Sequence, residues 1–87
     1  MTFRVERLVA GEMVVLRVSG RIEDAGVDTL RELLKQEEGK VAIDLREVTL
    51  ISREAIGFLA LSEVNGVELR NCADYIGEWI ARERRRK

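Results

Sequence analysis

The stretch KVAIDL, residues 40–45, limits the choice of fold more than any other, because it is a nearly continuous apolar run that ends at charged residues. Such a short run is typical of a central parallel strand that is covered on both faces. Parallel strands need a crossover connection, and residues 23–39 have the pattern of a helix. There the apolar side chains Val27, Leu30 and Leu34 recur at helical spacing. The chain is therefore expected to contain a parallel β-α-β unit.

Other strands flank this unit. Residues 3–9 alternate apolar and charged side chains, which indicates an edge strand with one face in water. Residues 13–20 are rich in β-branched side chains and follow a turn-like AGE, so the two segments predict a hairpin. Residues 67–71 alternate again and predict a last strand on the far edge of the sheet.

Two further helices are expected. Residues 52–64, SREAIGFLALSEV, are apolar almost all round, so this helix should be the most buried of the set. Residues 72–87 predict a terminal helix, with Ile76 and Ile80 on its apolar stripe. The order β, β, α, β, α, β, α predicts an α/β fold with a four-stranded mixed sheet, about three helices and right-handed crossovers, in a single domain of residues 1–87.

Tyr75, Trp79 and Cys72 fall on or beside the apolar stripe of the last helix. We interpret them as core packing rather than as a cofactor site. If part of the stripe stays exposed, the helix offers a contact for a homodimer.

The composition argues against an enzyme. The chain contains no histidine, which removes the commonest metal ligand and the usual general base near neutral pH. We find no catalytic constellation, no zinc-type ligand spacing and no phosphate-binding glycine loop, so we expect no cofactor and no metal. A single cysteine cannot form an internal disulfide, which favours a reducing compartment and hence a cytoplasmic location.

Charge is distributed unevenly along the chain. Residues 82–87 carry five basic groups and one acid, whereas the rest of the chain is acidic. We interpret this basic tail as a solvated helix end that complements the helix dipole, because no aromatic side chain is interleaved with it. No nucleic-acid partner is therefore expected. The chain also lacks an apolar run near 18 residues, so we expect no membrane insertion.

Taken in order, the segments VVLRVSGRI, VAIDLREVTLISREAIGFLA and GVELRNC resemble the STAS domain, the fold of the bacterial anti-sigma-factor antagonists. The strongest element of the likeness is Asp44-Leu45 with the residues that follow, which the family writes approximately as D-L-x-x-V-x-F-[ILM]-D-S-[SA]-G-[LI]-G. Only nine residues separate Gly57 from Val67, fewer than is usual in the family. The chain therefore resembles a shortened STAS domain.

The resemblance also predicts a missing switch. In the family, the serine after the aspartate of D-S-S-G is phosphorylated by a partner anti-sigma kinase, and the nearby surface docks that partner. Here Ser52 falls on the family aspartate, Arg53 on the phosphorylatable serine, Glu54 on the next residue and Ala55 on the glycine. Arginine cannot accept the phosphate, and it carries a permanent positive charge where the family installs a negative one.

Each candidate site residue can be explained by the fold as well as by a function. Ser52 stands where an N-cap is expected, Glu54 suits the first turn of a helix, and Arg53 does not, which makes Arg53 the preferred contact residue. Asp44 is expected to accept hydrogen bonds from the following loop or to pair with Arg21. Because loops at the carboxyl ends of strands commonly bind ligands, the candidate surface is Ser52, Arg53, Glu54, Gly20, Arg21 and Asp44.

These expectations combine into a non-enzymatic protein-binding module. By resemblance, its partner is an anti-sigma-type kinase or a component of a signalling or transport assembly, docked at the start of the helix without phosphate control. The alternative is a STAS-like module of a transport system that binds a small ligand, a nucleotide or a lipid, in a pocket lined by Gly20, Arg21 and Asp44.

Overall fold

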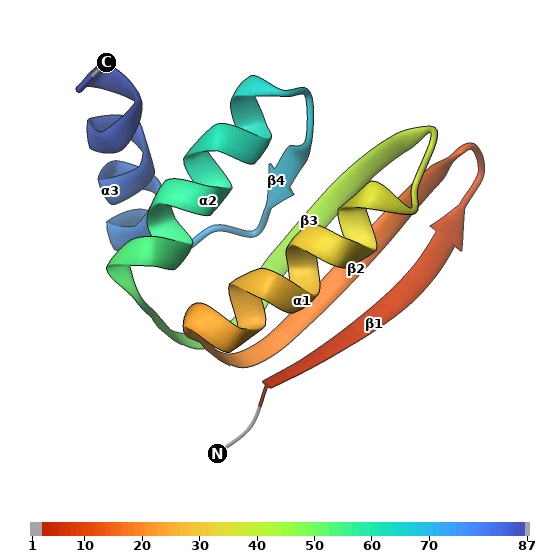
Figure 1. Ribbon diagram of the computed structural model, residues 1–87, viewed down its shortest axis with the longest axis horizontal. Coiled ribbons are helices and arrows are strands. Elements are labelled where there is room, and N and C mark those ends of the chain that lie inside the picture. Colours follow the sequence, from red (N-terminus) through yellow and green to blue (C-terminus); the bar gives the residue numbers. More distant parts are fainter. Residues whose placement is uncertain (1–2, 87) are drawn as a thin grey trace.

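The computed structural model describes residues 3–86, and its elements follow the predicted order. Within that range the chain forms an α/β fold of four strands and three helices (Figure 1). The elements are β1 (Phe3–Ala10), β2 (Met13–Ile22), α1 (Asp24–Lys35), β3 (Lys40–Ile51), α2 (Arg53–Val64), β4 (Glu68–Arg70) and α3 (Asp74–Arg85). The predicted fold class is confirmed.

The strands form one mixed sheet in the order β1-β2-β3-β4. β1 and β2 pair antiparallel as a hairpin, and β3 pairs parallel with β2 on one side and with β4 on the other. The run that begins at Val41 is therefore a central strand, as its apolar composition predicts. β4 is only three residues long, so it pairs with the first half of β3 alone.

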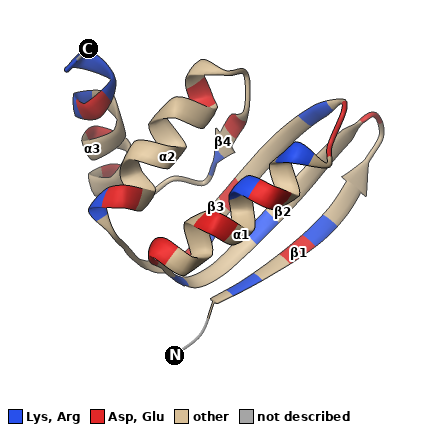
Figure 2. Ribbon diagram, in the orientation of Figure 1, with Lys and Arg blue, Asp and Glu red and all other residues tan. Residues whose placement is uncertain are grey.

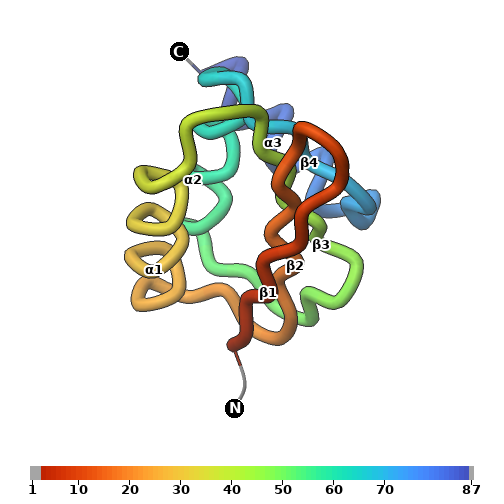
Figure 3. Tube along the Cα trace, turned by 90° about the vertical axis from the view of Figure 1, so that its right-hand side faces the viewer, coloured from red at the N-terminus to blue at the C-terminus, as the bar shows by residue number. Residues whose placement is uncertain are grey.

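The helices lie mainly on one side of this sheet. α1 and α2 cover the same face, and α3 packs against α2 at the β4 end (Figures 1 and 3). No helix among the described residues covers the other face of β1 and β2. Val15 and Ala42 are nevertheless buried on that face. There the side chain of Arg70 in β4 reaches across β3, and its Nη2 lies 3.0 Å from the sulfur of Met13 in β2.

The core lies between the sheet and the helix layer. Its largest fully buried side chains are Leu16, Ile22, Leu30, Ile43, Ile56, Leu59, Ile76, Val18 and Val27. α2 supplies more buried residues than α1 or α3, so the prediction that it is the most buried helix is confirmed. No helix in residues 3–86 has the length and apolar character needed to cross a membrane.

The end of β3 differs from the prediction. The strand was expected to end at Leu45, before the charged pair of Arg46 and Glu47, but it continues to Ile51. β2 pairs with β3 over this whole extension, with two register shifts that each insert an extra residue into β3. Such bulges let charged and apolar side chains keep their separate faces while the strand continues.

Candidate functional site

The start of α2 is fixed to the end of β2 through Ser52. The Ser52 hydroxyl accepts a hydrogen bond from the backbone N–H of Ala55 at 3.1 Å, and this confirms the predicted N-cap. The backbone N–H of Ser52 donates to the carbonyl of Ile22 at 2.9 Å. The first turn of α2 is therefore held beside the end of β2, and Ser52 is only partly exposed.

Arg53 and Glu54 form the first turn of α2, and both are exposed. Within residues 3–86 their side chains make no hydrogen bond or ion pair. Glu54 is favoured at this position by the partial positive charge of the helix N-terminus, whereas Arg53 is not. The local structure thus accounts for Glu54 and leaves Arg53 without a structural role.

Gly20 and Arg21 lie at the same end of the sheet. Gly20 has φ 89°, a backbone conformation that residues with a side chain rarely adopt. It lies at a point where the register between β2 and β3 shifts. Arg21 lies opposite Leu50 on the open face of the sheet, and both side chains are exposed. The structure therefore brings Gly20, Arg21 and the start of α2 together, because Ser52 bonds to Ile22.

Leu50 also lies at this end of the sheet, and it was not among the predicted site residues. It is 48% exposed, although it is a large apolar side chain. The sequence carried a signal for it, because adjacent residues of a strand point to opposite faces and Ile51 is in the core. We call Arg21, Leu50, Arg53 and Glu54 the helix-start surface.

Asp44 lies elsewhere. Between Asp44 and Ile51, which precedes Ser52, β3 runs alongside five residue steps of β2, from Arg17 to Ile22, a length of about 17 Å at the rise of a β-strand. In the sheet register Asp44 is opposite Arg17, while Arg21 is opposite Leu50. The expected pairing of Asp44 with Arg21 is therefore wrong, because β3 runs six residues beyond the expected end, and the pocket expected from Gly20, Arg21 and Asp44 is not formed.

Asp44 instead fixes the connection between β4 and α3. Its carboxylate accepts hydrogen bonds from the backbone N–H of Arg46 and from the side-chain amide of Asn71, each at 3.0 Å. Partial burial opposes its ionisation, but these two hydrogen bonds and the positive charges of Arg17 and Arg46 outweigh burial and lower the pKa of Asp44. Asn71 has φ 56°, so the Asp44 bond holds a strained turn.

Asp44 also belongs to a row of alternating charges across the open face of the sheet. In the strand registers Glu6 is opposite Arg17, Arg17 is opposite Asp44, and Asp44 is opposite Arg70. Beside this row lies a shallow polar hollow of about 210 Å³, lined by Arg4, Glu6, Arg17, Ser19 and Glu47. Opposite charges on adjacent strands stabilise the sheet, which is a structural explanation for these residues.

The aromatic and sulfur side chains of the last helix differ in burial. Trp79 and Cys72 pack against the core, as expected, but Tyr75 is 55% exposed and its assignment to the core is wrong. Tyr75 precedes the buried Ile76, and adjacent residues of a helix point in different directions. Burial raises the pKa of the Cys72 thiol, and the negative charge of Glu63 adds to this effect, so the thiol is less reactive.

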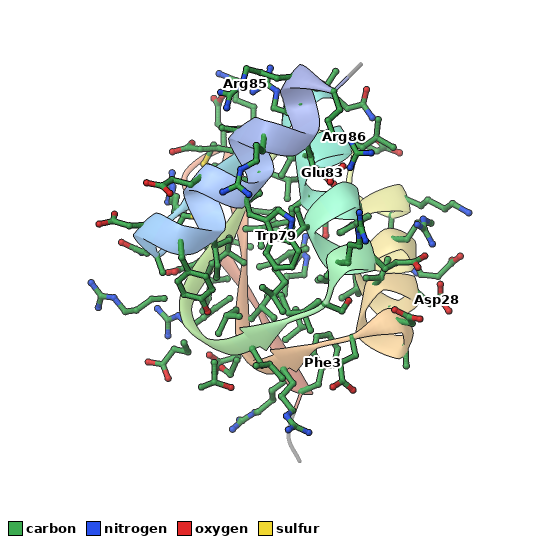
Figure 4. The ribbon with its side chains drawn as sticks, turned by 90° about the vertical axis from the view of Figure 1, so that its left-hand side faces the viewer. Phe3, Asp28, Trp79, Glu83, Arg85 and Arg86 are labelled. Carbon is green, nitrogen blue, oxygen red and sulfur yellow. The ribbon has the colours of Figure 1, made fainter. Side chains whose placement is uncertain are left out.

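The basic segment of residues 82–87 is mostly helix, because α3 continues to Arg85. Arg84 bonds to Glu63 of α2 at 3.1 Å, and Arg86 bonds to Glu83 at 3.4 Å. In Figure 4, Glu83 and Arg86 lie on the side of α3 that faces α2. Two of the tail's basic groups are thus paired within the fold, while Lys87 lies outside the described residues.

Comparisons with known proteins support the fold. No family model matches the chain. A search of curated proteins also finds no match by sequence. Among solved structures, the anti-sigma factor antagonist SpoIIAA in its unphosphorylated form superposes with a TM-score of 0.65 at 18% sequence identity, over 88% of this chain and 79% of that chain. The predicted resemblance is confirmed at the level of structure: the chain has the STAS fold of SpoIIAA.

Proposed function

We propose that the chain is a non-enzymatic protein-binding module that docks a regulatory protein through the helix-start surface. The observation that carries the proposal is the exposure of Arg53 and Glu54, which bond to no other side chain within residues 3–86, on a first turn fixed by Ser52. A preorganised surface loses little conformational entropy when a partner binds. At the same end of the sheet, on its open face, Arg21 adds a second positive charge and Leu50 an exposed apolar side chain.

The proposed docking takes place without the phosphate switch of the family. Arg53 stands at the position that carries the phosphorylatable serine, and a guanidinium accepts no phosphate. Ser52 has a hydroxyl, but that hydroxyl accepts the hydrogen bond that caps α2. The surface is therefore permanently positive at Arg53 and selects a partner with an acidic contact region.

We place the module in the cytoplasm, where its single cysteine would remain reduced. By resemblance, the partner is an anti-sigma-type kinase or a component of a signalling or transport assembly. SpoIIAA, whose fold the chain shares, is itself named as an antagonist of an anti-sigma factor. That role supports a protein partner for this chain rather than a substrate.

Comparative capture from the native cell tests the proposal. The chain is used as bait beside Arg53→Glu and Arg85→Glu variants, which make the same charge change at an exposed arginine on α2 and on α3. We expect one partner to be retained by the chain and by Arg85→Glu and lost with Arg53→Glu. Calorimetry with the purified partner should then show at least about tenfold weaker binding for Arg53→Glu. Equal binding by both variants would exclude the helix-start surface.

The small-ligand alternative predicts a different result. A thermal-shift screen with nucleotides and fatty acids would show consistent stabilisation by one ligand class if the module binds a ligand. We expect no stabilisation, because Asp44 lies far along β3 from Gly20 and Arg21 and does not complete a pocket with them.

A further inference from the structure

The outward face of α2 is apolar although no element of the described chain covers it. Leu61 and Val64 are 60% and 59% exposed, and Gly57 lies one turn before Leu61 on the same side of the helix. Figure 2 shows that the charges of α2 lie near its two ends, with no charged residue along the middle of the helix. Large apolar side chains exposed together in this way mark an interaction surface.

This face carries both a projection and a matching hollow. Leu61 and Val64 project from it, while a side-chain carbon added at Gly57 would meet no atom of the described residues within 4 Å. A hollow of about 490 Å³ lies between α2 and α3, lined by Gly57, Ala60, Leu61, Val64, Glu83 and Arg84. A helix that offers a leucine beside a glycine notch can pack against a second copy of itself, with each leucine in the other's notch.

The charges at the two ends of this face are complementary. Glu54 lies at the start of α2. Arg84 of α3 lies beside the other end of α2, where it bonds to Glu63. If two α2 helices pack antiparallel about a two-fold axis, Glu54 of one copy comes opposite Arg84 of the other. The guanidinium has five N–H donors, so it can bond Glu63 and a second carboxylate together.

The last helix offers less apolar surface for a dimer contact than its sequence suggested. Ile76 and Ile80 of its apolar stripe are 1% and 4% exposed and α3 packs against α2, while Tyr75 beside the stripe is exposed. The apolar face without a cover belongs to α2 instead.

We propose that the chain forms a two-fold symmetric dimer in which α2 packs antiparallel against α2 of a second copy. Leu61 of each copy occupies the notch at Gly57 of the other, Val64 lies beside this contact, and Glu54 pairs with Arg84 across the interface. The dimer is a property of the purified chain alone and does not require the partner proposed above.

Sedimentation equilibrium of the full chain over a wide range of concentrations tests this. We expect a mass of twice 9.9 kDa for the chain and at least about tenfold weaker association for Leu61→Glu. Val9→Glu makes the same kind of change at a 65% exposed side chain on β1 and should leave the dimer intact. A monomer at every concentration, or equal loss with both variants, would overturn the dimer.

Two further variants distinguish a weakened dimer from a chain that no longer folds. Gly57→Gln fills the notch while improving helix propensity, so it should raise the unfolding temperature of the monomer and yet weaken the dimer. Glu54→Arg should weaken the dimer, and adding Arg84→Glu should restore it. Unchanged association with Gly57→Gln, or no recovery in the double variant, would overturn the antiparallel arrangement.

Discussion

The backbone N–H of Ser52 donates to the carbonyl of Ile22 at 2.9 Å, so the start of α2 and the end of β2 form one joined unit. The hydroxyl of the same serine caps α2 through Ala55. One residue thus ends a strand, begins a helix and fixes the first turn that presents Arg53. The positions of Arg53 and Glu54 therefore depend on a side chain that the proposed partner need not touch.

Replacing this cap should destabilise the fold. Ser52→Ala removes the acceptor for the Ala55 N–H, and we expect a loss of about 1 kcal/mol in the free energy of unfolding. Ser52→Asp keeps an acceptor and adds a charge that the helix N-terminus favours, so it should retain the stability. Urea denaturation of the three proteins measures both effects. An alanine variant as stable as the aspartate variant would show that the cap contributes little.

Gly57 should be replaceable with a gain in stability. It lies in the middle of α2, where an added side-chain carbon meets nothing in the described part of the chain within 4 Å, so Gly57→Ala should stabilise the fold by about 0.5–1 kcal/mol. Gly26→Ala is the matched control, because the same carbon in α1 would lie 2.9 Å from the ring of Phe3.

Thermal unfolding of both glycine variants in the monomeric Leu61→Glu background separates helix propensity from dimer formation. We expect the alanine at position 57 to give the larger gain. An equal or larger gain at position 26 would mean that the Phe3 ring moves aside without cost.

The order and type of the elements could be predicted because apolar periodicity is a local property. The end of β3 could not, because two bulges against β2 change which residues face the core. A charged pair such as Arg46-Glu47 looks like a loop when no bulge is assumed. Because β3 is longer than predicted, Asp44 lies away from the candidate surface and Leu50 is exposed at its edge.

The burial of α2 was predictable only in part. An apolar segment indicates burial but does not say which face the neighbouring elements leave open. Leu59 is fully buried, whereas Leu61 is 60% exposed, because α1 and α3 flank the helix and nothing among the described residues lies over it. The position of the open face depends on tertiary packing, which local sequence does not encode.

The lowered pKa of Asp44 predicts a loss of stability in acid. A carboxyl whose pKa is lower in the folded than in the unfolded chain stabilises the fold above its ordinary pKa of 3.8 and loses this effect as the pH falls through the folded value. Asp44→Asn lacks the charge, so it should be less stable at neutral pH by about 1 kcal/mol. The difference should shrink once the wild-type carboxyl is protonated.

Chemical denaturation of both proteins from neutral pH to below the ordinary pKa of aspartate measures this difference. Asp28→Asn is a suitable control, because Asp28 is exposed and pairs with Arg31 on its own helix. A constant gap between the Asp44 variant and the parent across the acid range would contradict a role for the ionised carboxylate.

The attachment of α3 to α2 should depend on apolar packing rather than on its ion pair. Ile80 is 4% exposed in the core, so Ile80→Ala should cost about 2–5 kcal/mol. The side chains of Arg84 and Glu63 are 46% and 37% exposed, so Arg84→Ala should cost less than about 1 kcal/mol. Hydrogen exchange of the α3 amides, measured beside global unfolding, distinguishes local release of the helix from loss of the whole fold. If Arg84→Ala released α3 as readily as Ile80→Ala, the basic end of the chain would be a structural fastening rather than a solvated helix end.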